Sequence, residues 1–252
     1  MAKASVDRNR YTNPVNQAVR STAQTLLLKP AVWSLLKIQV HGLEHLDVLH
    51  NPRGFIVVGN HSSHFDAPLI IGALPSKLSK RLSAGAAADH FFEKWYVAAS
   101  TSLFFNAFPV DRTGSRNKKG LASQLLSEGV PLLIFPEGTR SRTGGMGVFK
   151  PGAAALCISH NVPALPVALV GAHAAWPPGE KRWRPGRPEV HVVFGNPMMP
   201  HPGEIAHEFN ERIRRAIMEL HDTTATAYGM PTQAEFQQYL ALPSKPSKPE
   251  LG

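Results

Sequence analysis

Apolar positions follow two different spacings along the chain, and together they predict strands interleaved with helices. Short apolar runs favour strands over residues 37–43, 55–59, 82–86, 108–110, 132–135, 164–170 and 189–194. Apolar residues three and four apart predict helices over residues 67–74, 90–103, 117–127, 151–160 and 204–221. Strands that alternate with helices are typical of a layered α/β domain.

The N-terminal segment has a helical pattern of its own. Residues 14–35 show helical spacing interrupted at Pro30, which predicts two short helices meeting at the proline. Cations such as Arg20 and Lys37 flank its leucines. Two interpretations stay open here: helices packed on the domain, or an amphipathic anchor at a membrane surface.

These patterns divide the chain into three parts. Residues 1–36 form the N-terminal helices, residues 37–242 form the α/β domain, and the Pro- and Lys-rich residues 243–252 form a tail that we expect to be disordered. Two charge-free stretches, residues 95–110 and 151–179, are interrupted by polar residues or prolines. Neither is the continuous apolar run that a membrane-spanning helix needs, so we expect peripheral attachment at most.

Composition narrows the class of protein. With 43% hydrophobic residues among 252, the chain can bury a large core, and its single cysteine excludes a disulfide scaffold. The 27 Lys and Arg against 18 Asp and Glu give a net charge of +9. That excess predicts an anionic partner, which is a nucleic acid, a membrane surface or a phosphorylated substrate.

The densest polar cluster, residues 60–66, comes directly after the predicted strand 55–59. Ligands bind at the carboxyl ends of strands in α/β sheets. A histidine there, His61, is a suitable general base, and Asp66 is close enough in sequence to orient it. The alternatives are a polar loop with capping serines, and a metal site of His61, His64 and Asp66, whose spacing does not match binuclear zinc hydrolases.

A protein nucleophile to complete a triad is missing from the sequence pattern. Ser62 and Ser63 do not lie in a G-x-S-x-G elbow, and Cys157 lies among alanines in a predicted core helix. One interpretation is that the substrate itself carries the activated nucleophile, for example a hydroxyl group.

A second polar cluster, residues 135–141, follows the predicted strand 132–135 and has the composition of a phosphate site. Gly138 permits close backbone approach, Thr139 offers a hydroxyl, and Arg140 can bind an oxyanion with two nitrogen atoms. Seven basic residues against three acidic ones give residues 111–150 a net charge of +4. Much of the basicity therefore lies beside the candidate site.

These clusters, in this order, resemble the 1-acyl-glycerol-3-phosphate acyltransferase family of glycerolipid acyltransferases. The family's N-H-x-x-x-x-D block appears at residues 60–66, and its F-P-E-G-T-R-S block is matched in full at residues 135–141. Residues 106–112 resemble the second block, with Asn106 where the family has glycine, and residues 162–167 resemble the fourth. The resemblance covers roughly residues 38–200.

The resemblance implies a mixed sheet flanked by helices and a specific reaction. His61, oriented by Asp66, would take the proton from the free hydroxyl of lysophosphatidate as it attacks the thioester of acyl-CoA or acyl-carrier protein. We expect no bound metal and no cofactor. The resemblance assigns the acceptor's glycerol phosphate to Arg112, Glu137, Gly138, Thr139 and Arg140. For Glu137, an anion, we expect a contact with a hydroxyl or with one of the two arginines.

Several alternatives stay open. The acceptor is lysophosphatidate by default, and another lysophospholipid or a glycolipid is the alternative. A metal-dependent hydrolase and a non-catalytic basic lipid-binding module are the competing classes. Residues 176–187 combine two tryptophans with cations, as in membrane contacts, exposed loops or donor contacts. We expect a membrane surface on the cytoplasmic side as partner, and no nucleic acid.

Overall fold

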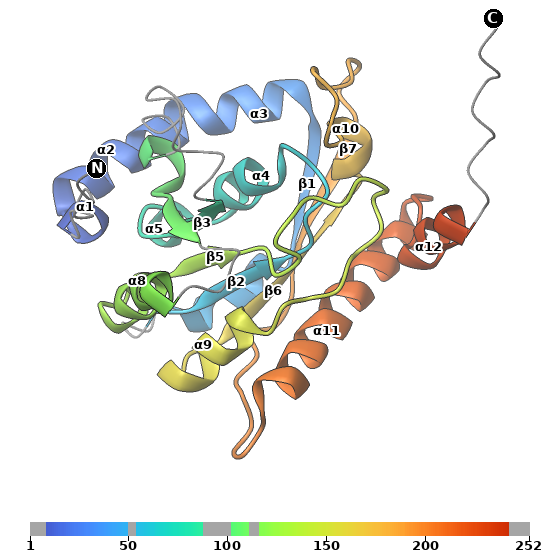
Figure 1. Cartoon of the computed structure of the whole chain (residues 1–252). Helices are drawn as coiled ribbons and strands as arrows, with labels where there is room; N and C mark the ends of the chain where they lie inside the picture. Colours follow the sequence, from blue (N-terminus) through green and yellow to red (C-terminus); the bar gives the residue numbers. More distant parts are fainter. Residues whose placement is uncertain (1–8, 50–53, 88–101, 111–115, 242–252) are drawn as a thin grey trace, which may run out of the picture.

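The computed structural model describes residues 9–49, 54–87, 102–110 and 116–241, and its centre is a seven-stranded sheet (Figure 1). The order of the strands is β1-β7-β6-β2-β5-β3-β4. Strands β6 and β7 run antiparallel, and the other described pairs are parallel, so the sheet is mixed as predicted. The strands are β1 (Lys37–His41), β2 (Ile56–Gly59), β3 (Ser83–Ala87), β4 (Phe108–Val110), β5 (Leu132–Ile134), β6 (Ala164–Val170) and β7 (Glu189–Phe194).

Helices cover both faces of this sheet. Figure 1 shows α9 and α11 on one side and α3 and α4 on the other. The helices of the domain are α4 (Asp66–Ala73), α5 (Ser76–Ser79), α8 (Arg116–Ser127), α9 (Gly152–His160), α10 (Ala172–Ala175), α11 (Ala206–Ala227) and α12 (Gln233–Ala241). A 3₁₀ segment, Leu43–Leu49, follows β1.

The side chains of β2 pack alternately into two hydrophobic clusters, one on each face of the sheet. Ile56 and Val58 pack in one cluster with Phe209 of α11, and Val57 packs in the other with Leu69 of α4. Successive side chains of a strand point to opposite faces, so a strand buried on both sides is a continuous apolar run. This is the pattern by which the sequence predicted the strand.

The N-terminal helices differ from the prediction of two helices broken at Pro30. Helix α2 (Pro14–Ala23) continues through a π-helical turn (Gln24–Leu28) into α3 (Lys29–Leu35). A proline ring clashes with the carbonyl four residues earlier and donates no hydrogen bond. The wider π turn directly before Pro30 accommodates both effects, so the proline does not interrupt the helix.

Most other predictions match within one or two residues, with a few corrections. Strand β1 ends at His41, short of the predicted residue 43, because Gly42 has a φ of 75°. Helix α11 reaches Ala227, six residues beyond its predicted end, and α12 was not predicted. Residues 102–105 are helical, while the rest of the predicted helix 90–103 lies outside the described residues, as does the tail 243–252. Across the described ranges, no helix has the length and apolarity to cross a bilayer.

Candidate active site

The predicted base and its orienting carboxylate lie together at the carboxyl end of β2. The Nδ1 atom of His61 is 2.8 Å from Oδ2 of Asp66, the first residue of α4. Asp66 is fully buried, and the side chain of His61 is about one-fifth exposed. A buried carboxylate at Nδ1 fixes the imidazole tautomer and leaves Nε2 as the nitrogen that faces away from Asp66.

Asp66 also holds the turn on which His61 lies. Its Oδ2 atom accepts hydrogen bonds from the backbone N–H groups of Ser62, at 2.7 Å, and Ser63, at 2.8 Å. Three donors on one oxygen fix the carboxylate, and its position at the start of a helix favours the negative charge. The residues between the histidine and the aspartate thus shape the turn itself.

Glu137 holds the same turn from the neighbouring strand. Its Oε1 accepts the backbone N–H of His61 at 2.7 Å, and its Oε2 accepts that of Gly147 at 2.9 Å. Both carboxylate oxygens therefore bind backbone N–H groups, a role that the sequence did not predict. Burial raises the pKa of Glu137, and the backbone hydrogen bonds from Gly147 and His61 oppose that rise.

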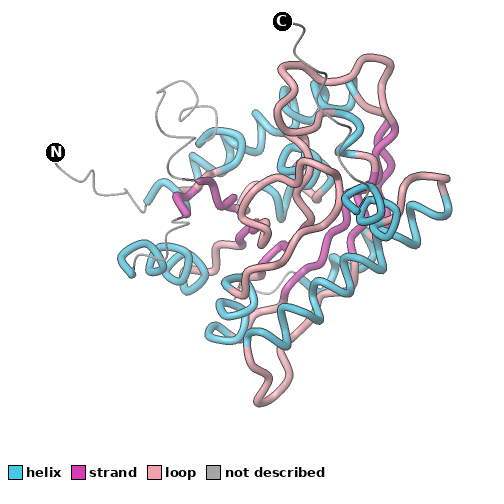
Figure 2. Tube along the Cα trace, turned by 45° about the vertical axis from the view of Figure 1, so that its right-hand side comes forward, coloured by secondary structure: helices cyan, strands magenta, loops and turns pink. Residues whose placement is uncertain are grey.

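Two further contacts join the β2 and β5 turns. The His61 ring stacks on Phe135, with ring centres 4.1 Å apart, and the backbone N–H of Ser141 donates to the His61 carbonyl at 2.7 Å. Because β2 and β5 are parallel neighbours, their carboxyl ends bring these turns to the same edge. Figure 2 shows loops gathered around the central strands.

Arg140 contacts His64 beside this pair. Its Nη1 atom contacts Nδ1 of the His64 ring and is 3.2 Å from Nε2. Burial lowers the pKa of His64, and the neighbouring Arg140 lowers it further, which favours the neutral ring. The His64 ring also packs at 4.7 Å from Trp176, and the backbone N–H of His64 donates to the Trp176 carbonyl. His64 therefore lies against the Arg140 cation. Within the described residues, no group of three His, Cys, Asp or Glu side chains could hold a metal ion.

Of the other predicted binding residues, Gly138 and Thr139 lie on the turn after β5. Gly138 has a φ of 74°, the left-handed region that favours glycine, and a Cβ there would meet Nζ of Lys150 at 3.1 Å. Thr139 is exposed on the same turn. Lys150, one of the seven basic residues counted in residues 111–150, lies near this turn. Arg112 lies outside the described residues.

Comparison with known proteins identifies the family. The acyltransferase family model matches residues 37–170, more than half of the chain. The chain belongs to the acyltransferase family.

The relatives and a solved structure agree with this membership. A Chlamydomonas reinhardtii 1-acyl-sn-glycerol-3-phosphate acyltransferase is 34% identical over 72% of this chain and 52% of its own. The mouse alpha enzyme of the same name is 30% identical over 67% and 58%. The crystal structure of the lysophosphatidate acyltransferase PlsC from Thermotoga maritima superposes with a TM-score of 0.66 over 95% of this chain and 86% of that one, at 24% identity, which shows a shared fold. This family member spans about half the length of the curated relatives it matches.

Two further residues support the His61 turn in roles that the sequence did not predict. Asn60 forms two hydrogen bonds with the backbone of Leu169, at 2.8 and 3.0 Å, and so ties the His61 turn to β6. The Nδ1 atom of His173, on α10, lies 3.1 Å from the carbonyl oxygen of Ser62. Asn60 opens the N-H-x-x-x-x-D block, so its position in the motif was an available signal. Asn106 adopts a φ of 49°, which asparagine tolerates better than most residues, so it can stand where the family has glycine.

Proposed function

We propose that this protein transfers a fatty acyl group from acyl-CoA or acyl-carrier protein to the free hydroxyl of lysophosphatidate, giving phosphatidate. The observation that carries this proposal is the 2.8 Å contact between His61 and the buried Asp66 at the carboxyl end of β2. The names of the relatives, all 1-acyl-sn-glycerol-3-phosphate acyltransferases, support the choice of acceptor.

The proposed reaction needs no protein nucleophile. Nε2 of His61 takes the proton from the acceptor hydroxyl, and the hydroxyl oxygen forms a bond to the thioester carbonyl carbon. The tetrahedral intermediate then breaks its carbon–sulfur bond, and the imidazolium returns the proton to the leaving sulfur. Asp66 stabilises the imidazolium that forms between these steps, as an orienting carboxylate does in a hydrolase triad.

For the acceptor's phosphate we propose the turn after β5 and its neighbours. Arg140 is the cation of that turn, and Gly138 exposes the backbone beside it. The family resemblance adds Thr139 and Arg112. Glu137 enters as a residue that positions His61, since its two oxygens bind the backbone N–H groups of His61 and Gly147.

We propose that the enzyme works at a membrane surface, attached peripherally on the cytoplasmic side. The N-terminal helices expose large apolar side chains: Val15, Val19, Leu26 and Leu27 are each more than half exposed. The segment 176–187 adds a half-exposed Trp183 among exposed cations. Apolar side chains beside cations are typical of surfaces that bind anionic bilayers.

The decisive experiment is acyl transfer by His61→Ala, with labelled acyl-CoA and lysophosphatidate. Loss of a general base predicts a fall in kcat of about 10²–10⁴-fold, and Asp66→Asn should lose activity for the same reason. His207→Ala, an exposed histidine of α11, is the matched control and should keep full activity. Full activity in His61→Ala with native circular dichroism would contradict the assignment of the base.

The same assay separates the alternatives. A panel of lyso-acceptors reports headgroup and position, and preference for another lysophospholipid or a glycolipid would redirect the acceptor assignment. Activity lost to a chelator would support the metal-dependent hydrolase. Binding to anionic vesicles without turnover on any acyl donor would support the non-catalytic module.

A further inference from the structure

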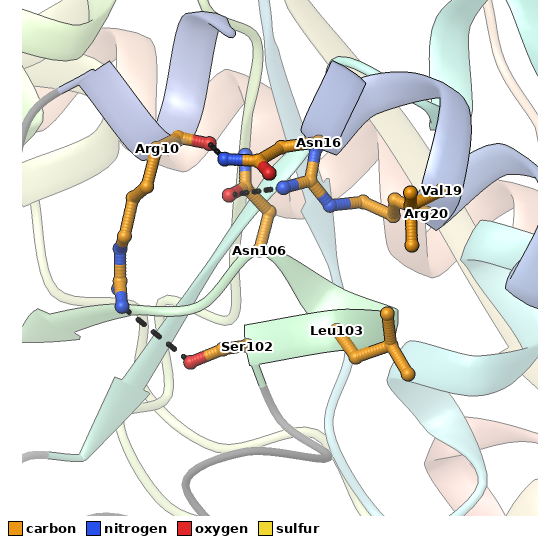
Figure 3. Close-up of a pocket in the computed structure, with 7 residues that line it drawn as sticks. All are labelled: Arg10, Asn16, Val19, Arg20, Ser102, Leu103 and Asn106. Atoms are coloured by element: carbon orange, nitrogen blue, oxygen red, sulfur yellow. Dashed lines mark hydrogen bonds between the residues drawn. The ribbon is translucent and has the colours of Figure 1, made fainter.

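A cavity of about 210 Å³ lies between the N-terminal helices and the segment that enters β4 (Figure 3). It lies near the amino ends of β3 and β4, since Arg20 binds the Lys80 carbonyl before β3 and Asn106 precedes β4. The His61 and Arg140 turns follow the carboxyl ends of β2 and β5, which is the opposite edge of the sheet. Its lining residues are Arg10, Asn16, Val19, Arg20, Ser102, Leu103 and Asn106.

Arg20 is a buried cation in the wall of this cavity. It is 4% exposed, and its guanidinium donates to the Lys80 carbonyl at 3.0 Å and to Oδ1 of Asn106 at 2.8 Å. Both acceptors are uncharged, and Nε has no hydrogen-bond partner among the described residues. A buried guanidinium without a carboxylate partner is costly, so the site favours an anion.

Two more groups complete the wall. Asn106 is 2% exposed, and its Nδ2 donor has no partner within the described part of the chain. Arg10 is half-buried and donates to the Ala107 carbonyl at 2.7 Å and to the Tyr11 hydroxyl at 2.7 Å. Figure 3 shows Arg10 on one side of the space and the Arg20–Asn106 pair on the other.

The electrostatics of the lining agree with this arrangement. The seven lining residues include two cations and no acidic residue. Burial and the neighbouring Arg10 lower the pKa of Arg20 to about 10. The protein therefore holds two positive charges close enough to disfavour each other, without a carboxylate from the lining between them.

We propose that this cavity binds a phosphate group, held by the side chains of Arg10, Arg20 and Asn106. A phosphate monoester carries a charge of about −1.5 to −2 and three acceptor oxygens, which matches two guanidinium groups and an amide donor. The group comes either from a soluble phosphate or from an anionic lipid headgroup. Val19, 53% exposed, and Leu103, 36% exposed, supply apolar surface at the lining for a lipid.

The test is thermal stability in inorganic phosphate against chloride at equal ionic strength. Asn106→Asp places a carboxylate on Arg20, so this variant should melt higher than wild type in chloride and lose the saturable rise of Tm with phosphate. Asn161→Asp is the matched control, because Asn161 has a φ of 50° and is exposed at the end of α9. It should keep the wild-type response to phosphate.

A second pair of variants removes donors without adding charge. Asn106→Gly suits the φ of 49° and removes the Nδ2 donor, and Arg10→Gln removes one cation. Both should bind inorganic phosphate about tenfold or more weakly by calorimetry. These variants keep the proposal testable if Asn106→Asp does not fold.

Vesicles distinguish the two sources of phosphate. Wild type and Asn106→Asp are sedimented with phosphatidylcholine vesicles that contain or lack phosphatidate, whose headgroup is a phosphate monoester. Asn106-dependent binding of phosphatidate vesicles supports a lipid headgroup, and an Asn106-dependent response to inorganic phosphate alone supports a soluble ligand. The proposal is overturned if wild type and Asn106→Asp show the same rise of Tm with phosphate and the same binding to the vesicles.

Discussion

Two buried carboxylates hold the His61 turn, and they do so in different ways. Asp66 binds the ring and two backbone N–H groups of the turn, while Glu137 binds the backbone N–H of His61 from the next strand. Ring and backbone of one residue are thus fixed from opposite directions. An imidazole held at both points keeps its geometry without help from the substrate, which suits the role of general base that we propose for His61.

Glu137→Gln tests this interpretation at the residue scale. A glutamine has one oxygen, so it can satisfy one of the two backbone N–H groups and turns an amide toward the other. We expect kcat to fall about 10²-fold, the effect of about 1 Å of misplacement, with the KM for lysophosphatidate nearly unchanged. A rise in KM with kcat intact would instead make Glu137 an acceptor-binding residue. Steady-state kinetics with varied acceptor measures the two effects separately.

At the scale of elements, backbone conformation at single residues determines where strands end. Strand β1 stops before Gly42, whose φ of 75° turns the chain away from the sheet. A Cβ at Gly42 would overlap the carbonyl oxygen of Phe194, the last residue of β7. The edge of the sheet therefore depends on a close backbone approach that only glycine permits.

Gly42→Ala should destabilise the protein more than the backbone strain alone explains. Gly203 has a φ of 78° and open space where a Cβ would lie, so Gly203→Ala carries only the strain of about 1–2 kcal/mol. Gly42→Ala adds overpacking, for a total of about 3 kcal/mol or more. Chemical denaturation of both variants measures the difference. Equal losses would show that the Phe194 carbonyl moves aside at little cost.

At the scale of the molecule, the N-terminal helices present two surfaces. Arg20 and Gln24 point inward and bind the Asn106 side chain and the Phe104 carbonyl, which ties these helices to the domain. Leu26 and Leu27, 66% and 60% exposed, lie on the same continuous helical segment. The two interpretations of residues 14–35 are therefore compatible, because one face packs and another stays free for a membrane.

Leu26→Ser combined with Leu27→Ser should weaken binding to anionic vesicles with little change in Tm. The two leucine side chains are already exposed in the folded protein, so their replacement removes little buried apolar area and changes stability little. Binding to the bilayer loses about 25 cal/mol for each Å² of apolar surface that the leucines would bury there. Val48→Ser, a similarly exposed position in the 3₁₀ segment after β1, is the control. Vesicle sedimentation measures the effect, and unchanged binding by the double variant would remove these helices from the membrane contact.

The alternation of strands and helices and the positions of the proposed catalytic pair could be predicted from the sequence alone. These features are local: a strand buried on both faces must be apolar throughout, and His61 and Asp66 are five residues apart on one turn. The sequence did not predict α12, nor the π turn that carries the helix past Pro30.

The contacts between residues far apart in the sequence follow from tertiary packing. Glu137 reaches the His61 backbone across 76 residues, and Arg20 reaches Asn106 across 86. Sequence spacing carries no information about such pairs, because they meet only when parallel strands bring their ends to one edge or when the N-terminal helices pack beside β4. The role of Glu137 and the Arg20 cavity both follow from that packing.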